Sequence, residues 1–331
     1  PIVIAALSFT PRHLLVRVNA TNGTSADDVL LQFNGDTGSN YNRQYLLGNG
    51  TSELAGRDTS TTFINSMTYP GGTDDVFGGG EILVTDALST RSHKAMISMA
   101  GAAESFMLSC GGRWASTAAI TSVTLTANNQ TFAVGSTFEL CVVDESFNID
   151  QAGDGELILS SDGTFSVGSI GAADGDLVVI GNLRDASSNY AQVSTYQLNG
   201  DSTATNYNVQ KIEGTVSGVS GSSENNNRFA SIVGNTAVTS AYSPTVTQVT
   251  NFSDGSNDRV TTTFYGYHAG TGDTYDASVG IRTSRWNNTA AITSYVLPLT
   301  YESGSMLSTY AVPKNLIERI EIIGDSEGSK T

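Results

Sequence analysis

The stretch RWASTAAITS at residues 113–122 organises this chain, because the sequence contains it twice. The second copy, RWNNTAAITS at residues 285–294, agrees at eight of ten positions and lies 172 residues further on. A second motif precedes each copy. FNGD at 33–36, followed by NYN at 40–42, recurs as LNGD at 198–201 followed by NYN at 206–208. Two motifs in the same order, with slowly drifting spacing, indicate a duplicated domain rather than a short solenoid repeat.

The length of 331 residues agrees with two domains of about 150 residues each. We expect a first module at residues 1–145 and a second at 156–323, followed by a polar tail at 324–331. The acidic, glycine-punctuated segment between the modules, residues 146–155, is the expected linker. An additional apolar stretch, Leu316–Ile323, has no counterpart after the first module.

Short runs of Val, Ile, Leu, Phe and Tyr alternate with gaps rich in Gly, Ser, Thr, Asn and Asp, which is typical of all-β proteins. We therefore predict an all-β fold of two tandem jelly-roll-like β-sandwich domains. Gly48–Ser60 is expected to be a loop, and Gly214–Asn227 a mobile surface loop. The predicted strands are 2–7, 13–18, 28–33, 40–47, 81–85, 93–100, 104–110, 136–143, 156–159, 176–180, 193–198, 206–212, 245–250, 259–267, 277–282, 291–297 and 306–312.

Charge and hydropathy exclude two classes of partner. The chain carries 16 Lys and Arg against 32 Asp and Glu, a net charge of −16, and has no basic cluster of the kind that binds phosphate backbones. No apolar run approaches the ~18 residues that a membrane span requires. We expect neither a nucleic-acid nor a membrane partner. An acidic surface serves solubility or docking onto a basic partner, and the sequence leaves both open.

Few residues form patterns that carry chemistry. The three histidines, His13, His93 and His268, are not duplicated and are expected to be surface or hydrogen-bonding residues. Cys110 and Cys141 form no disulfide framework, although a bridge between them is possible. We predict no catalytic, cofactor-binding or metal-binding residues and no cofactor.

Three weaker patterns have an ordinary structural reading beside the functional one. GVSGS at 218–222 only half-resembles a nucleophile elbow. The acidic segments Asp150–Asp154 and Asp254–Asp258 could bind calcium through oxygens, but neither completes the twelve-residue loop, and turn formation explains both. Paired carboxylates for glycoside hydrolysis stay possible, since such residues are often distant in sequence.

The repeated aromatic residues allow two interpretations. Tyr41 and Tyr207, with Trp114 and Trp286, could be stacking platforms for sugars in each module. Alternatively the Asn-Gly-Asp segment is a tight hairpin, and the Trp covers the end of the core with the preceding Arg packed over its ring. Because both copies keep the turn-forming residues, the structural interpretation is favoured.

The combination of FNGDTGSNYN with RWASTAAITSVTL and FAVGSTFEL resembles a widespread family of tailed-bacteriophage virion proteins. Residues 13–143 cover nearly a whole module of that family, and residues 156–312 resemble a second, more divergent one. The family's closing Tyr-Gly is replaced by Cys141-Val142 in the first module and by Tyr310-Ala311 in the second. The resemblance implies a jelly-roll-like structural protein of the virion and brings no catalytic residues.

This resemblance leads us to expect a capsid decoration (cement) protein on the outer capsid surface, held by many weak symmetric contacts. Its expected partners are the major capsid protein and copies of itself, as a homotrimer. The first alternative is a tail or head-fibre component that binds host glycans. The second is a polysaccharide-degrading enzyme.

Overall fold

The structure is a computed structural model. It describes residues 2–5, 13–21, 27–69, 77–102, 106–143, 156–168, 170, 175–253, 255–270 and 277–313. Within these residues the regular structure is β-strand, apart from one turn of 3-10 helix at Ala204–Asn206. The predicted all-β sandwich fold is confirmed.

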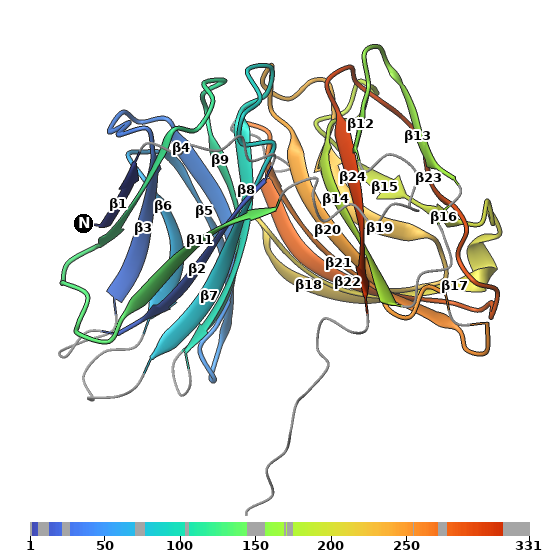
Figure 1. Ribbon diagram of the computed structural model, residues 1–331, viewed down its shortest axis with the longest axis horizontal. Helices are drawn as coiled ribbons and strands as arrows, with labels where there is room; N and C mark the ends of the chain where they lie inside the picture. Colours follow the sequence, from blue (N-terminus) through green and yellow to red (C-terminus); the bar gives the residue numbers. More distant parts are fainter. Residues whose placement is uncertain are drawn as a thin grey trace, which may run out of the picture.

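Strands between residues 2 and 143 form the first sandwich, which has a small and a large antiparallel sheet (Figure 1). The small sheet has the order β1 (Ile2–Ala5), β10 (Ser122–Ala127), β3 (Asp27–Phe33) and β6 (Ile64–Tyr69). The large sheet has the order β11 (Thr137–Val143), β2 (His13–Ala20), β7 (Gly78–Thr85), β8 (Lys94–Ala102), β9 (Phe106–Trp114), β4 (Tyr41–Gly48) and β5 (Glu53–Thr61).

Strands between residues 156 and 313 form the second sandwich. Its large sheet has the order β12 (Glu156–Ile158), β24 (Met306–Pro313), β14 (Gly175–Leu183), β20 (Ser243–Val249), β21 (Arg259–His268), β22 (Ala277–Trp286), β17 (Tyr207–Thr215) and β18 (Gly218–Glu224). Two small sheets cover it, one of β13 (Gly163–Val167), β23 (Tyr295–Tyr301) and β16 (Gln197–Leu198), and one of β15 (Ala191–Thr195) and β19 (Arg228–Val233).

The two large sheets share one strand order. The order β11-β2-β7-β8-β9-β4-β5 in the first sandwich corresponds strand by strand to β24-β14-β20-β21-β22-β17-β18 in the second. Each order contains a meander of three consecutive strands, β7-β8-β9 and β20-β21-β22, within a single sheet. The connectivity therefore departs at this place from simple jelly-roll alternation between sheets.

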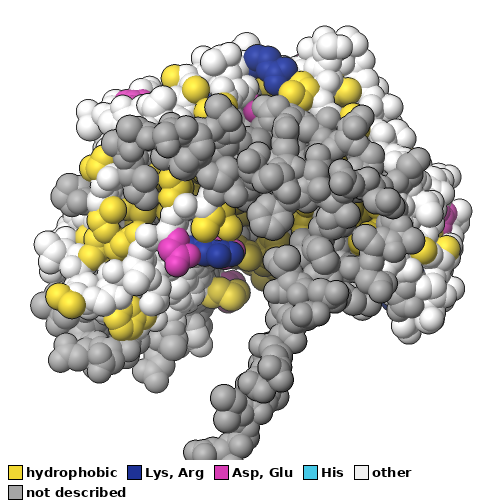
Figure 2. Space-filling view, in the orientation of Figure 1, with side chains coloured by type: hydrophobic (Ala, Val, Ile, Leu, Met, Phe, Trp, Pro, Cys, Tyr) yellow, Lys and Arg dark blue, Asp and Glu magenta, His cyan; other side chains and the backbone are white. Residues whose placement is uncertain are grey.

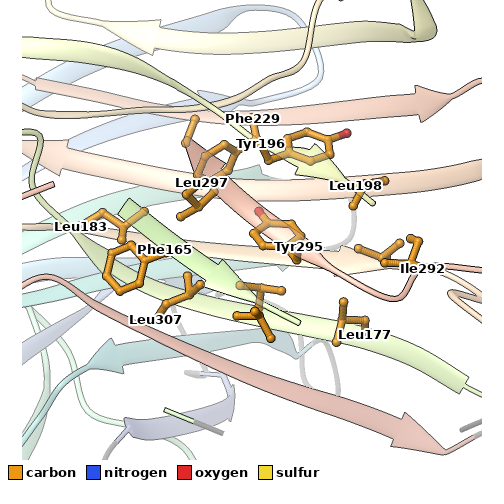
Figure 3. Close-up of a cluster of buried hydrophobic side chains, with 14 of the residues drawn as sticks. Phe165, Leu177, Leu183, Tyr196, Leu198, Phe229, Ile292, Tyr295, Leu297 and Leu307 are labelled. Atoms are coloured by element: carbon orange, nitrogen blue, oxygen red, sulfur yellow. The ribbon is translucent and has the colours of Figure 1, made fainter. Parts of the chain in front are cut away.

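Each sandwich has its own hydrophobic core between its large and small sheets. In β2, alternate residues from Leu14 to Ala20 point into the first core, while the residues between them point to the other face of the large sheet. The second core is more aromatic and includes Phe165 of β13, Tyr295 of β23 and Tyr196, which lies between β15 and β16 (Figure 3). Separate cores explain how two sandwiches form side by side in one chain.

The outer faces of the two large sheets pack against each other, so the molecule has four layers (Figure 1). Backbone meets backbone at Gly111 and Gly266, where a Cβ added to Gly111 would lie 2.8 Å from the Cα of Gly266. This packing of the two large sheets covers β8 on both sides. Met96 points into the first core, whereas Ala95 and Ile97 are buried on the face toward the second sandwich.

Two predicted loops are wrong. Gly48–Ser60 contains the edge strand β5, and Gly214–Asn227 contains the end of β17, a turn and the edge strand β18. The predicted strand at 291–297 begins later, at Tyr295, because residues 291–294 belong to the repeated motif. The linker, the stretch Leu316–Ile323 and the polar tail lie outside the described residues.

Candidate functional site

The repeated Asn-Gly-Asp segment is a tight turn at the end of a strand. Asn34 and Gly35 have φ values of 53° and 65°, and Asn199 and Gly200 have 52° and 71°. A turn with positive φ at both central residues favours Asn followed by Gly, because both tolerate the left-handed region. The amide of Asp36 closes the first turn by donating to the carbonyl of Phe33 at 2.9 Å.

The Asn side chain of each turn clamps the loop that follows the repeated Trp. The Oδ1 atom of Asn34 accepts hydrogen bonds from the amides of Thr121 and Ser122 at 2.7 and 3.1 Å, and its Nδ2 donates to the carbonyl of Ala119 at 2.8 Å. Asn199 makes the same three bonds to Thr293, Ser294 and Ala291, at 2.7, 3.2 and 2.8 Å. The two repeated motifs therefore form one unit in space.

The Asp of each turn joins the same unit through the Trp. The indole Nε1 of Trp114 donates to Asp36 at 2.6 Å, and that of Trp286 donates to Asp201 at 2.8 Å. The bond from Trp114 is the largest cause that lowers the pKa of Asp36. Burial acts to raise the pKa of Asp201, but its bonds from Trp286 and Asn206 outweigh burial and lower it. Both carboxylates are thus ionised acceptors.

The aromatic residues of the unit are buried. Tyr41 stacks on Trp114 with ring centroids 6.3 Å apart, and Tyr207 stacks on Trp286 at 6.5 Å. All four side chains are at most 3% exposed. Burial raises the pKa of Tyr41 to about 12, so its hydroxyl stays protonated and donates to the carbonyl of Asp36. A sugar cannot stack on these rings here, which supports the structural interpretation of the motif.

A buried cation completes each unit, and sequence reasoning missed it. Lys94 is the cross-strand partner of Trp114, and its Nζ donates to the carbonyls of Ser92 and Thr117 at 3.1 and 3.5 Å. Arg259 holds the same position beside Trp286 and donates to the carbonyl of Thr289 at 3.1 Å. Burial lowers the pKa of Lys94 to about 8.

The prediction that the Arg before each Trp packs over its ring is wrong, because neighbouring residues of a strand point to opposite faces. Trp114 points into the first core, whereas Arg113 is buried where the two large sheets meet and approaches Gly270 of the second sandwich. Arg285 is exposed and forms an ion pair with Asp258, whose Oδ2 lies 2.7 Å from its Nε.

The three histidines lie where the two sandwiches meet. His13 faces the second sandwich, with its Nε2 3.3 Å from the hydroxyl of Ser308. The backbone amide of His93 donates to the carbonyl of Ser240 at 2.8 Å. His268 is 2% exposed and lies two residues after Gly266 on the same face of β21. They are hydrogen-bonding or buried residues, and only packing of the two sandwiches brings them to one interface.

We expect acid to weaken the molecule through His93. Burial, together with the positive charges of Arg113, Lys94 and Arg184, lowers the pKa of His93 from 6.5 to about 4. Below pH 6.5 the unfolded chain binds a proton at His93 that the folded chain does not bind. The contribution of neutral His93 to the free energy of unfolding is therefore complete above pH 6.5 and is lost as the pH falls toward 4.

This prediction is checked by thermal unfolding at pH 7 and at pH 4.5. The drop in melting temperature between the two values should be smaller in His93→Gln than in the unaltered chain. Equal drops in melting temperature would contradict the assignment of this acid sensitivity to His93. Carboxylates with lowered pKa values, such as Asp36, act in the same direction but only below their ordinary pKa of 3.8.

One further buried carboxylate has no counterpart in the first sandwich. Glu213 of β17 accepts hydrogen bonds from Ser278, Ser231 and Tyr265 at 2.7, 2.9 and 3.0 Å, and pairs with Lys211 at 3.1 Å. Burial acts to raise its pKa, but the bond from Ser278 and the charge of Lys211 outweigh it, so the pKa is lowered. An ionised, fully bonded carboxylate is suited to holding strands together, and not to donating a proton.

The remaining candidate residues are not brought together. Cys110 and Cys141 are both free, and their strands lie four positions apart in the large sheet. Four strand spacings are about 19 Å, beyond the ~7 Å between Cα atoms that a disulfide allows. Asp150–Asp154 and Asp254 lie outside the described residues. GVSGS at 218–222 lies in the edge strand β18 and forms no nucleophile elbow.

Comparison with known proteins adds no assignment. No protein-family model matches the chain, and a search of curated proteins finds no match either. Within the described ranges, no group of three or more His, Cys, Asp or Glu side chains could hold a metal ion. Among those same residues, no helix is long and apolar enough to span a membrane.

Proposed function

We propose that the chain is a structural protein of a tailed-phage virion, and specifically a capsid decoration protein on the outer surface of the shell. The observation that carries this proposal is the use made of the repeated residues. Asn34, Asp36, Tyr41 and Trp114 satisfy one another and the adjoining backbone, as do their counterparts in the second sandwich. The repeated side chains therefore hold each sandwich rigid, and a rigid fold suits a shell-stabilising role.

The surface composition supports the same role. With a net charge of −16 the protein repels its own copies at long range, so that assembly has to come from specific short-range contacts repeated around a symmetric support. Each such contact can be weak, because many of them act together. The partners we propose are the major capsid protein and further copies of this chain, as a homotrimer.

The glycan-binding alternative calls for exposed aromatic rings gathered on one group of loops. Within the described residues, the exposed large hydrophobic side chains include a single aromatic one, Tyr190, at 42% exposure. One ring does not make a sugar-binding platform of the kind that several stacked rings provide. The alternative therefore has less support than the decoration role.

The test is quantitative mass spectrometry of purified virions, with the amount of this chain expressed per copy of the major capsid protein. We expect a ratio near one chain per capsid subunit, or a simple fraction of it, as a shell-covering protein requires. A handful of copies per particle would move the chain to the tail or a vertex and would favour the fibre alternative. Absence from the particle would refute both virion roles.

A further inference from the structure

The two large sheets touch at one end and separate toward the other. They touch at Gly111 and Gly266. Further along β9, toward its start, Met107 is 69% exposed, and the neighbouring Met99 of β8 is 38% exposed. Across the gap, Ile212 of β17 and Val260 of β21 are 44% and 40% exposed. These apolar side chains belong to the two faces that are buried against each other at the closed end.

The separation forms a groove with apolar walls and a volume of about 430 Å³. Met99, Met107 and Leu46 line it from the first sandwich, and Ile212 and Ile281 line it from the second. Figure 2 shows a hollow between the two lobes, with hydrophobic side chains inside it. A groove of this size with apolar walls offers water few hydrogen-bonding partners, and exposed apolar patches of this kind mark binding surfaces.

The chain itself carries an apolar segment shortly after its last described strand. Strand β24 ends at Pro313, whereas strand register places Leu307, near its start, level with Tyr265 beside the Gly266 contact, so the chain leaves β24 at the end away from that contact. The residues after Pro313 lie outside the described residues. Their sequence includes LIERIEII at 316–323, in which five of eight residues are aliphatic. No matching segment follows the first sandwich, so the fold of the repeated module does not account for it.

The segment is long enough to reach the groove. Strand register places Ile281 level with Phe264, Val246, Ile180 and Ser308 in successive strands. Ile281 therefore lies four strand spacings, about 19 Å, to one side of Pro313 and five residues, about 17 Å, along the strand direction. The direct distance is about 25 Å, which ten extended residues can span at up to ~33 Å. Ten helical residues would span only ~15 Å, so the segment could reach the groove only in an extended form.

We propose that residues 316–323 bind in the groove between the two large sheets of their own chain, in an extended form. Ile322 and Ile323 are the residues that reach the apolar walls formed by Met99, Met107 and Ile212. Attachment at Pro313 gives the segment a high effective concentration at its own groove and favours binding within one chain over binding between copies. This inference does not depend on the proposed function.

The test measures how fast hydrogen peroxide oxidises individual methionines, because the oxidation of a methionine follows its exposure. In the full chain Met107 is protected by the bound segment, and the double variant Ile322→Asp, Ile323→Asp removes that protection. We expect oxidation of Met107 to become about tenfold faster in the variant. This factor corresponds to a segment that is unbound in about one molecule in ten of the unaltered protein. Peptide mass spectrometry reads each methionine separately.

Two controls accompany the measurement. Met96 and Met306 are fully buried and should oxidise slowly in both proteins, which shows that the variant is folded. Ser326→Asp adds a charge beyond the apolar stretch and should leave Met107 protected. Equal oxidation of Met107 in the full chain and the double variant would overturn the proposal. Protection that weakens on dilution would overturn it too, because the groove would then be filled by another copy.

Discussion

Replacing Gly111 with alanine is expected to lower the free energy of unfolding by about 1–3 kcal/mol, the usual cost of forcing an extra methyl group into a packed contact. The added Cβ would lie 2.8 Å from the Cα of Gly266 and 3.2 Å from its carbonyl carbon. Backbone atoms inside a sheet cannot rotate away as a side chain can. The two large sheets would have to separate to admit the methyl group.

Gly101→Ala is the matched control. Gly101 lies on the same face of the same sheet, but its nearest obstacle, the carbonyl oxygen of Phe106, is 3.6 Å from the added Cβ. That distance is ordinary van der Waals contact, so the control should be neutral or slightly stabilising, since alanine restricts the unfolded chain. Urea unfolding of both variants decides the matter. Equal midpoints would mean that the sheets do not meet at Gly111.

Replacing Trp286 with alanine is expected to destabilise the protein by about 3–5 kcal/mol, the range for deleting a buried Trp or Phe. Trp286 is fully buried, stacks on Tyr207 and donates its Nε1 hydrogen to Asp201. The variant loses this packing and leaves the carboxylate without its strongest partner. The second sandwich should unfold at a lower denaturant concentration than in the unaltered chain.

Trp286→Phe separates the two contributions, because phenylalanine keeps most of the ring packing but cannot donate to Asp201. We expect the midpoint of its chemical denaturation to lie between those of the unaltered chain and Trp286→Ala. The same pair of changes at Trp114 should give similar losses, since Asp36 and Tyr41 surround it in the same way. A near-neutral Trp286→Ala would refute the structural interpretation of the motif.

Local sequence was enough to predict the turn at Asn34-Gly35, because positive φ restricts the choice of residue. Most core-facing strands were equally clear, since Leu14, Val16 and Val18 alternate with outward residues. The edge strands could not be predicted in this way. β18 reads GVSGSSE and β5 reads ELAGRDTST, and neither shows the apolar alternation that strands with a buried face show.

Long-range contacts could not be predicted from the sequence, for another reason. Lys94 and Arg259 are both the buried cation beside a repeated Trp, but they are different residue types. They precede their Trp by 20 and 27 residues, so no repeated motif connects them. Arg113 and the three histidines acquire their surroundings only when one large sheet lies on the other. Nothing in the sequence near a single residue specifies which face of a distant sheet will cover it.

The four-layer arrangement has a consequence for thickness. The small sheets are the outermost layers and face in opposite directions, because the large sheets lie back to back between them. With about 10 Å between successive packed sheets, the planes of the two outer layers are about 30 Å apart. A molecule lying with one small sheet on a support would raise that surface by at least this amount. A coat one molecule deep would then appear in an image of the particle as a separate shell of density.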